Sequence, residues 1–118
     1  MQTHNIIDVG ECVIDVSADS QYSSVLDFTG WRSKLAALIF DGPADGTGTF
    51  RVQVSHSVED YDEYGSTWRD LQSNGADVTI PTDGSVRINT SVKGRLRIAS
   101  SAAEVLDRRF RVMGDDLT

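Results

Sequence analysis

The sequence has little of what metal sites and disulfide frameworks are built from. Its 118 residues include one cysteine and two histidines, His4 and His56. A zinc site of the common cysteine and histidine type needs three or four convergent ligands, and the spacing here offers no such set. Cys12 has no second cysteine for an internal disulfide, and it alternates with Ile14 and Val16. We therefore expect no cofactor, no metal and a buried thiol that packs as a small hydrophobe.

Long apolar runs and a basic N-terminus are also missing. No apolar run approaches the roughly 20 residues of a membrane-spanning helix. Residues 1–8 have neither a basic start nor an apolar core, so no signal peptide is predicted and we expect folding in a cytoplasm. The net charge of −7 works against non-specific binding to nucleic acid, because phosphate contacts need cations. We therefore expect neither membrane nor nucleic acid as a partner.

Catalytic signatures are absent as well. The sequence contains no Gly-Xaa-Ser-Xaa-Gly elbow. Ser55, His56 and Asp60 carry the side chains of a nucleophilic triad, but neighbouring residues on a strand point to opposite faces, which argues against Ser55 and His56 acting together. The 18 acids will always offer carboxylate pairs, so they do not indicate glycoside hydrolysis. The prediction is a protein that is not an enzyme.

What the sequence does have is alternation of apolar and polar residues. Phe50, Val52 and Val54 alternate with Arg51 and Gln53, which predicts a strand with one face toward a core. A single strand cannot bury that face alone, so a second layer must cover it. Short strands separated by turn signals are predicted over 11–19, 22–28, 49–55, 66–71, 76–80, 85–90, 95–99 and 107–113. The predicted fold is all-β: an antiparallel, jelly-roll-like β-sandwich of about eight short strands.

Three segments need separate interpretation. The apolar run 34–40 has helical composition but only seven residues, and strands flank it, so we predict a buried strand. Ser101-Ala-Ala-Glu104 fits a capping box, so one helical turn is possible there. Ser73-Asn-Gly75 and Asp83-Gly84 are turn signals of the kind that joins hairpins. The predicted organisation is an N-terminal arm or edge strand at 1–10, one sandwich domain at 11–114 and a frayed tail at 115–118.

An acidic, tyrosine-bearing loop follows the strand at 49–55. Its candidate interface residues are Glu59, Asp60, Tyr61, Asp62, Glu63 and Tyr64. The acids could hold calcium, but the twelve-residue calcium-loop spacing is missing, and a solvated loop is the simpler interpretation. Trp31 and Trp68 fit core or corner positions better than a sugar-binding platform. Tyr61 and Tyr64 are the better candidates for surface contact.

Arginines near the C-terminus share one property, which is that each alternates with apolar residues and so faces outward. The candidate interface residues are Arg87, Arg95, Arg97, Arg109 and Arg111. If 85–99 forms a hairpin, Arg87 lies near Arg95 or Arg97, and like charges facing each other destabilise a sheet. Carboxylates of the same chain, a neighbouring subunit or an anionic ligand could compensate, since the planar guanidinium pairs bidentately with carboxylates.

Charge is also spread unevenly along the chain. Residues 1–63 hold 11 acids and 3 bases, whereas residues 64–118 hold 7 acids and 8 bases. Opposite faces could therefore meet in a shared interface between copies. Acidic loops that neighbour arginine-bearing strands within one fold would give the same asymmetry.

The order of several segments resembles a known group of proteins. The segments are 22–31 (YSSVLDFTGW), 49–57 (TFRVQVSHS), 67–71 (TWRDL), 94–100 (GRLRIAS) and 110–112 (FRV). Together they are similar to small β-sandwich structural proteins of tailed bacteriophages, of the capsid decoration or cement type, over roughly residues 20–113. This resemblance implies a non-enzymatic virion protein that binds the major capsid protein and stabilises capsomer contacts.

The same resemblance implies self-association, with a trimer favoured, and no catalytic residues. An N-terminal arm could then add a strand to a neighbour by edge pairing. Two alternatives stay open: a carbohydrate- or receptor-binding sandwich module, and a tail or head–tail joining protein.

Overall fold

The computed structural model describes residues 4–27, 35–55, 68–89 and 94–117, and every regular element in these ranges is a strand. The longer strands are β1 (His4–Ile14), β3 (Leu35–Asp41), β4 (Phe50–Ser55), β9 (Ser85–Ile88), β10 (Arg95–Ser100) and β11 (Arg108–Leu117). Two-residue strands are β2 (Leu26–Asp27), β5 (Arg69–Asp70), β6 (Gln72–Ser73), β7 (Ala76–Asp77) and β8 (Thr79–Ile80). The described strands outnumber the eight that the turn spacing predicts, because β3 is counted with them, the segment 76–80 splits into β7 and β8, and β6 is an additional short strand.

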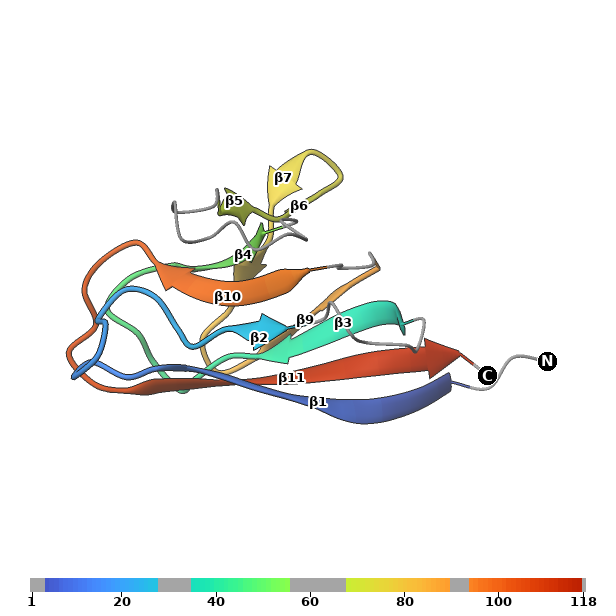
Figure 1. Ribbon diagram of the computed structural model, residues 1–118, viewed down its shortest axis with the longest axis horizontal. Coiled ribbons are helices and arrows are strands. Elements are labelled where there is room, and N and C mark those ends of the chain that lie inside the picture. The colour runs from blue at the N-terminus through green and yellow to red at the C-terminus, as the bar shows by residue number, and fades with distance from the viewer. Residues whose placement is uncertain (1–3, 28–34, 56–67, 90–93, 118) are drawn as a thin grey trace.

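Two antiparallel sheets form the body of the molecule (Figure 1). Sheet A has the order β1-β11-β3-β9, and sheet B has the order β2-β10-β4-β5 with β8 also paired to β4. The β6–β7 hairpin forms a small third sheet. The start of β1 and the end of β11 lie at one end of the body, and the connections between β1 and β2, β3 and β4, and β10 and β11 gather at the other. The prediction of an all-β antiparallel sandwich is confirmed.

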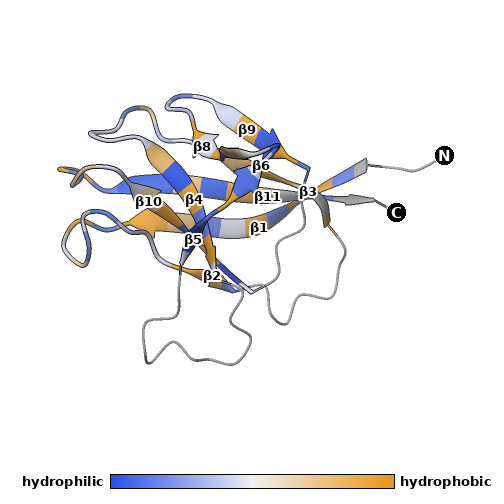
Figure 2. Cartoon of the chain, turned by 90° about the horizontal axis from the view of Figure 1, so that it is seen from above, coloured by the Kyte–Doolittle hydropathy of each residue, from blue (hydrophilic) through white to orange (hydrophobic). Residues whose placement is uncertain are grey.

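The core lies between the inner faces of the two sheets. Colouring by hydropathy shows the alternation along the strands (Figure 2). Phe50 of sheet B and Phe110 of sheet A meet edge to face, with ring centroids 4.8 Å apart. Cys12 is fully buried among these apolar side chains, as expected. Burial raises the pKa of its thiol to about 12, so it stays a neutral apolar group.

The first strand differs from the prediction in extent. Residues 4–14 form one continuous edge strand, β1, that pairs along its length with β11, so the arm or edge strand predicted at 1–10 and the strand predicted from 11 onward are joined. The register shifts between Asp8 and Gly10, which places a bulge at the point where the apolar period fails. The described part of the predicted arm is thus an edge strand of sheet A, paired on one side with β11. At the other end, β11 continues to Leu117 because β1 pairs with it, so 115–117 are not a frayed tail.

The segment predicted as a strand over 22–28 is mostly a corner. Ser23 exchanges hydrogen bonds with the backbone of Ile98 in sheet B, through its amide at 2.9 Å and its hydroxyl at 2.8 Å. Ser24 does the same with Val13 in sheet A, at 2.9 and 3.1 Å. One short segment therefore ties the two sheets together. Ser23 is buried and Tyr22 is exposed, so the predicted alternation fails here.

The remaining predictions have mixed outcomes. The run 34–40 does contain a buried strand, β3, and Ser73-Asn-Gly75 does join a hairpin, with positive φ at Asn74 and Gly75. Asp83-Gly84 makes a turn, but β8 and β9 on either side belong to different sheets. Ser101–Glu104 forms no helical turn, because the Glu104 carboxylate binds another loop, as described below.

Candidate functional site

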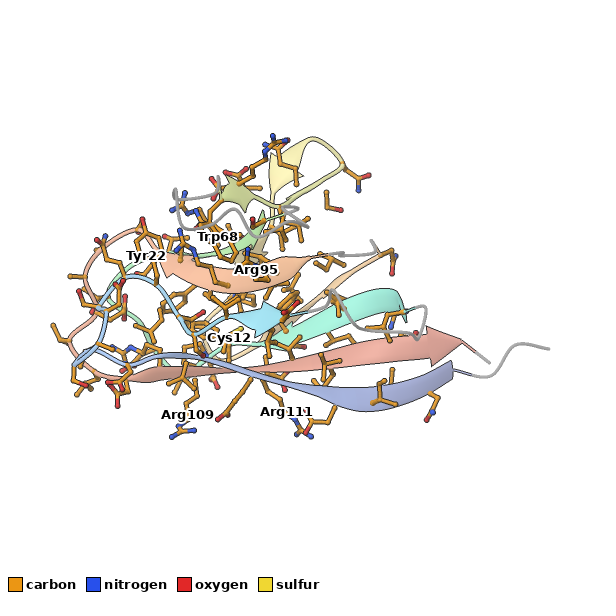
Figure 3. The ribbon with its side chains drawn as sticks, viewed as in Figure 1. Cys12, Tyr22, Trp68, Arg95, Arg109 and Arg111 are labelled. Atoms are coloured by element: carbon orange, nitrogen blue, oxygen red, sulfur yellow. The ribbon has the colours of Figure 1, made fainter. Side chains whose placement is uncertain are left out.

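The five candidate arginines divide between the two outer faces of the sandwich. Arg95 and Arg97 lie on β10 of sheet B, whereas Arg87 lies on β9 of sheet A. The expected hairpin over 85–99 is therefore wrong, since β9 pairs with β3 and β10 pairs with β4 and β2. Figure 3 shows Arg109 and Arg111 projecting from β11 on one side of the body, and Arg95, Tyr22 and Trp68 on the other.

On the outer face of sheet A, carboxylates of the same chain neutralise the arginines. The Arg109 guanidinium lies 2.8 Å from Glu11 on the neighbouring strand, and both side chains are exposed. Arg111 lies 4.0 Å from Asp8, and Arg87 pairs with the buried carboxylate of Asp115. Of the three sources of compensating charge left open by the sequence, the same chain supplies it on this face.

On the outer face of sheet B, Arg97 is held between two aromatic rings. Its guanidinium carbon lies 4.0 Å from the centroid of the Tyr22 ring and 4.4 Å from that of Trp68. Its Nε donates to the Gln53 side-chain oxygen at 2.9 Å, directly across the strand pair. Guanidinium groups stack well on aromatic faces, and this contact fixes a side chain that would otherwise sample many rotamers.

Asp70 is the carboxylate nearest in sequence to Trp68, but it binds side chains other than Arg97. Asp70 of β5 accepts a hydrogen bond from Gln53 at 3.0 Å and from Arg51 at 3.1 Å, so its two carboxylate oxygens are used. Among the residues that the structure describes, no carboxylate forms an ion pair with Arg97. Burial lowers the pKa of Arg97 from its ordinary value, and electrostatic interactions with Tyr22 and Asp19 oppose that shift. We call Tyr22, Gln53, Trp68 and Arg97 the arginine stack.

Sequence reasoning found Arg97 but not its partners in the stack. Trp68 was expected in the core or at a corner, and it is half-buried against a surface arginine. Tyr22 reaches the stack because it bridges to Ala99, two residues after Arg97 on β10. Trp31 and the loop residues Glu59, Asp60, Tyr61, Asp62, Glu63 and Tyr64 lie outside the described residues.

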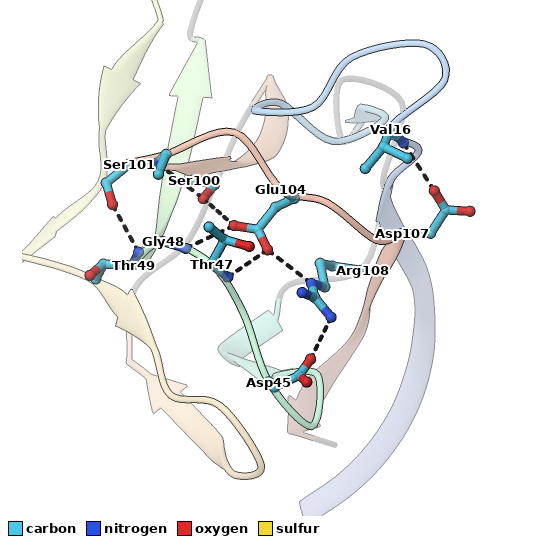
Figure 4. A network of polar contacts seen from close by, with 11 residues as sticks. Val16, Asp45, Thr47, Gly48, Thr49, Ser100, Ser101, Glu104, Asp107 and Arg108 are labelled. Atoms are coloured by element: carbon cyan, nitrogen blue, oxygen red, sulfur yellow. Dashed lines mark hydrogen bonds and ion pairs between the residues drawn. The ribbon is translucent and has the colours of Figure 1, made fainter.

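A second polar cluster lies at the loop end of the sandwich and was not predicted (Figure 4). The buried carboxylate of Glu104 accepts hydrogen bonds from the backbone amides of Thr47 and Gly48, at 2.8 and 2.9 Å. The Ser100 hydroxyl and the Arg108 Nε also donate to it, at 2.7 and 2.8 Å. Arg108 is buried as well and pairs with Asp45. We call this set the Glu104 network.

Burial alone would favour the neutral form of Glu104, but the four hydrogen bonds to its charged form outweigh that effect. They lower the pKa of Glu104 to about 2. The carboxylate is thus charged and satisfied, and it ties the β3–β4 connection to the β10–β11 connection. Its role is structural, and the sequence signal for it, Ser-Xaa-Xaa-Glu, is the one that suggested a capping box.

Neither a metal centre nor a membrane segment appears in the described part of the chain. No group of three or more histidine, cysteine, aspartate or glutamate residues there is arranged to hold a metal ion. No helix among these residues is long and apolar enough to cross a membrane. The described surface carries an aromatic and cationic patch on the outer face of sheet B and a charge-paired patch on the outer face of sheet A.

Comparisons with known proteins give a fold but no family. No protein-family model and no curated protein sequence matches the chain. Among solved structures, the chain is similar to YomS, a protein derived from the SPBc2 prophage, with a TM-score of 0.55 and 6% identity over 98% of this chain and 96% of that one. A mitogen from Yersinia pseudotuberculosis aligns with a TM-score of 0.39 and 8% identity over 100% of this chain and 92% of that one, which is too distant to support an argument. The chain thus has the all-β fold of a prophage-derived protein along nearly its whole length.

Proposed function

We propose that the chain is a non-enzymatic structural protein of a bacteriophage virion, and specifically a capsid decoration protein. In this role it binds the major capsid protein at the particle surface and stabilises the contacts between capsomers. The observation that carries the proposal is the end-to-end likeness in fold to a prophage-derived protein. Its site of action is the virion, after assembly in the host cytoplasm, and it needs no cofactor.

The arginine stack supports adhesion to a protein surface. Arg97 is held in place by two rings and one amide, while the carboxylate of Asp70 is engaged elsewhere. A guanidinium that is already ordered loses little further freedom when a carboxylate of a partner binds it, so more of the interaction energy appears as affinity. Tyrosine, tryptophan and arginine are also the residues most enriched at the energetic centres of protein interfaces.

Copies of the chain are the second partner that we propose, with a trimer as the favoured state. A trimer suits a decoration protein because capsids present threefold and quasi-threefold positions to which it could bind. Light scattering at physiological salt measures this directly. A stable trimer supports the proposal of self-association, and a monomer at every concentration tested removes it.

A carbohydrate- or receptor-binding module is the alternative that one observation favours, namely the two aromatic rings on an outer sheet face. Sugars bind aromatic side chains by stacking on the ring face. Here the Arg97 guanidinium lies over both the Tyr22 ring and the Trp68 ring, so one face of each ring is already occupied. That occupation makes the stack better suited to a carboxylate than to a sugar, and so ranks this function second.

The protein composition of purified particles tests the proposal. Virions of the phage that encodes the chain are purified by density gradient, and their proteins are quantified by mass spectrometry before and after removal of tails. We expect the chain in tail-free heads, at a copy number that matches capsomers. Presence only in the tail fraction would instead support a tail or head–tail joining protein. Absence from particles together with binding on a glycan array would overturn the proposal in favour of the carbohydrate-binding alternative.

A further inference from the structure

Two apolar side chains project from the β10–β11 connection at the loop end of the sandwich. Val105 and Leu106 are 71% and 61% exposed, more than any other large hydrophobic side chain that the structure describes. They are consecutive in the chain, and we call the pair the apolar tip. Such a pair adds little to the stability of its own chain, because most of each residue stays in contact with water.

The loop that carries the tip is fixed on both sides. Before it, Glu104 is anchored by the Glu104 network, and its amide also donates to the Ser20 carbonyl at 2.8 Å. After it, the Asp107 carboxylate accepts a hydrogen bond from the Val16 amide at 3.0 Å, and Arg108 is buried. The tip residues are therefore exposed while their flanking residues are locked to two other connections.

The β3–β4 connection approaches the loop that carries the tip so closely at Gly48 that a larger residue would clash. A Cβ atom added at Gly48 would lie 2.5 Å from the Ser100 hydroxyl and 2.6 Å from the Ala102 amide nitrogen. Backbone approach at this point lets the Gly48 amide reach the Glu104 carboxylate. Ordering a loop in advance lowers the entropy that binding must otherwise overcome, so the tip is arranged as an element that binds.

The surroundings of the tip are acidic. Asp107 follows it directly, Asp45 pairs with Arg108 and is 75% exposed, and Asp15 and Asp19 lie on the connection to which the loop is bonded. Negative charge on this rim disfavours an anionic lipid surface, and it complements lysine and arginine side chains on a partner.

We propose that Val105 and Leu106 insert into an apolar pocket, rimmed by basic side chains, on the surface of a partner protein. The inference rests on the proposed function, under which that surface belongs to the capsid. The tip and the arginine stack lie on either side of one connection, since Ser20 bonds to Glu104 and Tyr22 stacks on Arg97. A single partner surface can therefore span both.

Co-sedimentation with particles that lack the chain tests the tip. The purified full-length chain is titrated onto such particles and compared with the double variant Val105→Ser, Leu106→Ser. Because both positions are exposed, the variant is expected to keep the thermal midpoint of the wild type. We expect its binding to be at least tenfold weaker. The matched control is Val25→Ser, which removes an exposed apolar side chain elsewhere, and it is expected to change binding less than twofold.

The outcomes distinguish a failure of the tip from a failure of the proposed function on which it rests. Wild-type binding with unchanged binding by the double variant would overturn the tip and leave the proposed function standing. Failure of the wild type to bind would overturn both. Vesicles of phosphatidylcholine with phosphatidylserine form the last arm, and capture of the wild type but not of the double variant would identify the tip as a lipid anchor and contradict the protein pocket.

Discussion

One arginine on the outer face of sheet B differs from those on the outer face of sheet A. On sheet A, Arg87, Arg109 and Arg111 each meet a carboxylate of the same chain. On sheet B, Arg51 also pairs with a carboxylate, Asp70, but Arg97 meets two aromatic rings and an amide. The first face is neutralised before any partner arrives, and the second keeps an ordered cation on a partly apolar patch. Outward-facing arginines in a strand pattern are thus not one class of residue, and only neighbours brought by the fold tell them apart.

Because of this difference, binding through the two faces should depend differently on salt concentration. Exposed ion pairs such as Arg109–Glu11 contribute little and are screened at physiological ionic strength. An interface based on them would weaken strongly as salt rises. Contacts through the arginine stack combine a charge with aromatic burial, so their salt dependence should be shallower.

The largest effect is expected from Glu104→Gln, at the connection between sheet B and sheet A. The change removes the buried carboxylate that pairs with Arg108 and should cost about 4 kcal/mol of unfolding free energy. Urea denaturation measures it. Glu11→Gln, an exposed acid on sheet A, is the matched control. Equal stability of the two variants would mean that the Glu104 network does not hold the sheets together.

Acid denaturation of the wild type is a second test of how much the Glu104 carboxylate stabilises the fold. The folded-state pKa of Glu104 is about 2, below its ordinary value of 4.5. Its stabilising contribution is therefore complete above about pH 4.5 and is lost as pH falls through that value toward 2. In Glu104→Gln this part of the pH dependence should disappear, as followed by thermal midpoints between pH 2 and 6. A variant curve parallel to that of the wild type would contradict the assignment.

The next largest effect separates arginines within sheet A. Arg87→Gln leaves the buried Asp115 carboxylate without its guanidinium and should cost about 3 kcal/mol. Arg109→Gln removes an exposed pair and should cost less than about 1 kcal/mol. Both variants are compared by chemical denaturation. Similar losses for the two would show that burial does not distinguish these pairs.

A smaller effect is expected on binding from the arginine stack. Arg97→Ala should weaken binding to particles by roughly tenfold, which corresponds to about 1.4 kcal/mol. Arg97→Lys keeps the charge but not the planar stacking group, so it should recover only part of the affinity. Titration of both against particles lacking the chain measures this, with Arg109→Ala as the control on the other face. Full affinity in Arg97→Ala would contradict the claim that the arginine stack, and not the outer face of sheet A, contributes to binding.

The smallest effect is expected from the exposed pair itself. Glu11→Gln should lower stability by about 0.5 kcal/mol at low salt and by less in 0.5 M salt, because mobile ions screen the pair. Thermal midpoints at the two salt concentrations check this. A loss that persists at high salt would mean that the pair is less exposed to screening than its accessibility indicates.

The strands that sequence reasoning predicted well are those whose two faces differ. In β4 and β10, apolar residues alternate with arginine and glutamine, and the alternation survives because one face meets the core and the other meets solvent. The buried strand β3 could also be predicted from its short apolar run between turn signals. These patterns are local, and so is the information needed to interpret them.

The features that escaped prediction depend on distant partners. Ser23 and Ser24 interrupt a strand because each bonds to a different sheet, and no local pattern indicates that bridge. Glu104 was interpreted through its own neighbours, although its main partners lie 56 and 57 residues earlier at Gly48 and Thr47. Arg97 was found as a cation on an outer face, but the rings that make it distinct come from two other segments.

The most direct test of the account is a binding isotherm of the wild-type chain on purified particles from which it has been removed. If the chain is a decoration protein, binding saturates at a fixed number of copies per particle that corresponds to capsomers or threefold positions. Binding that never saturates, or a chain that stays in the supernatant at every concentration, would contradict that function.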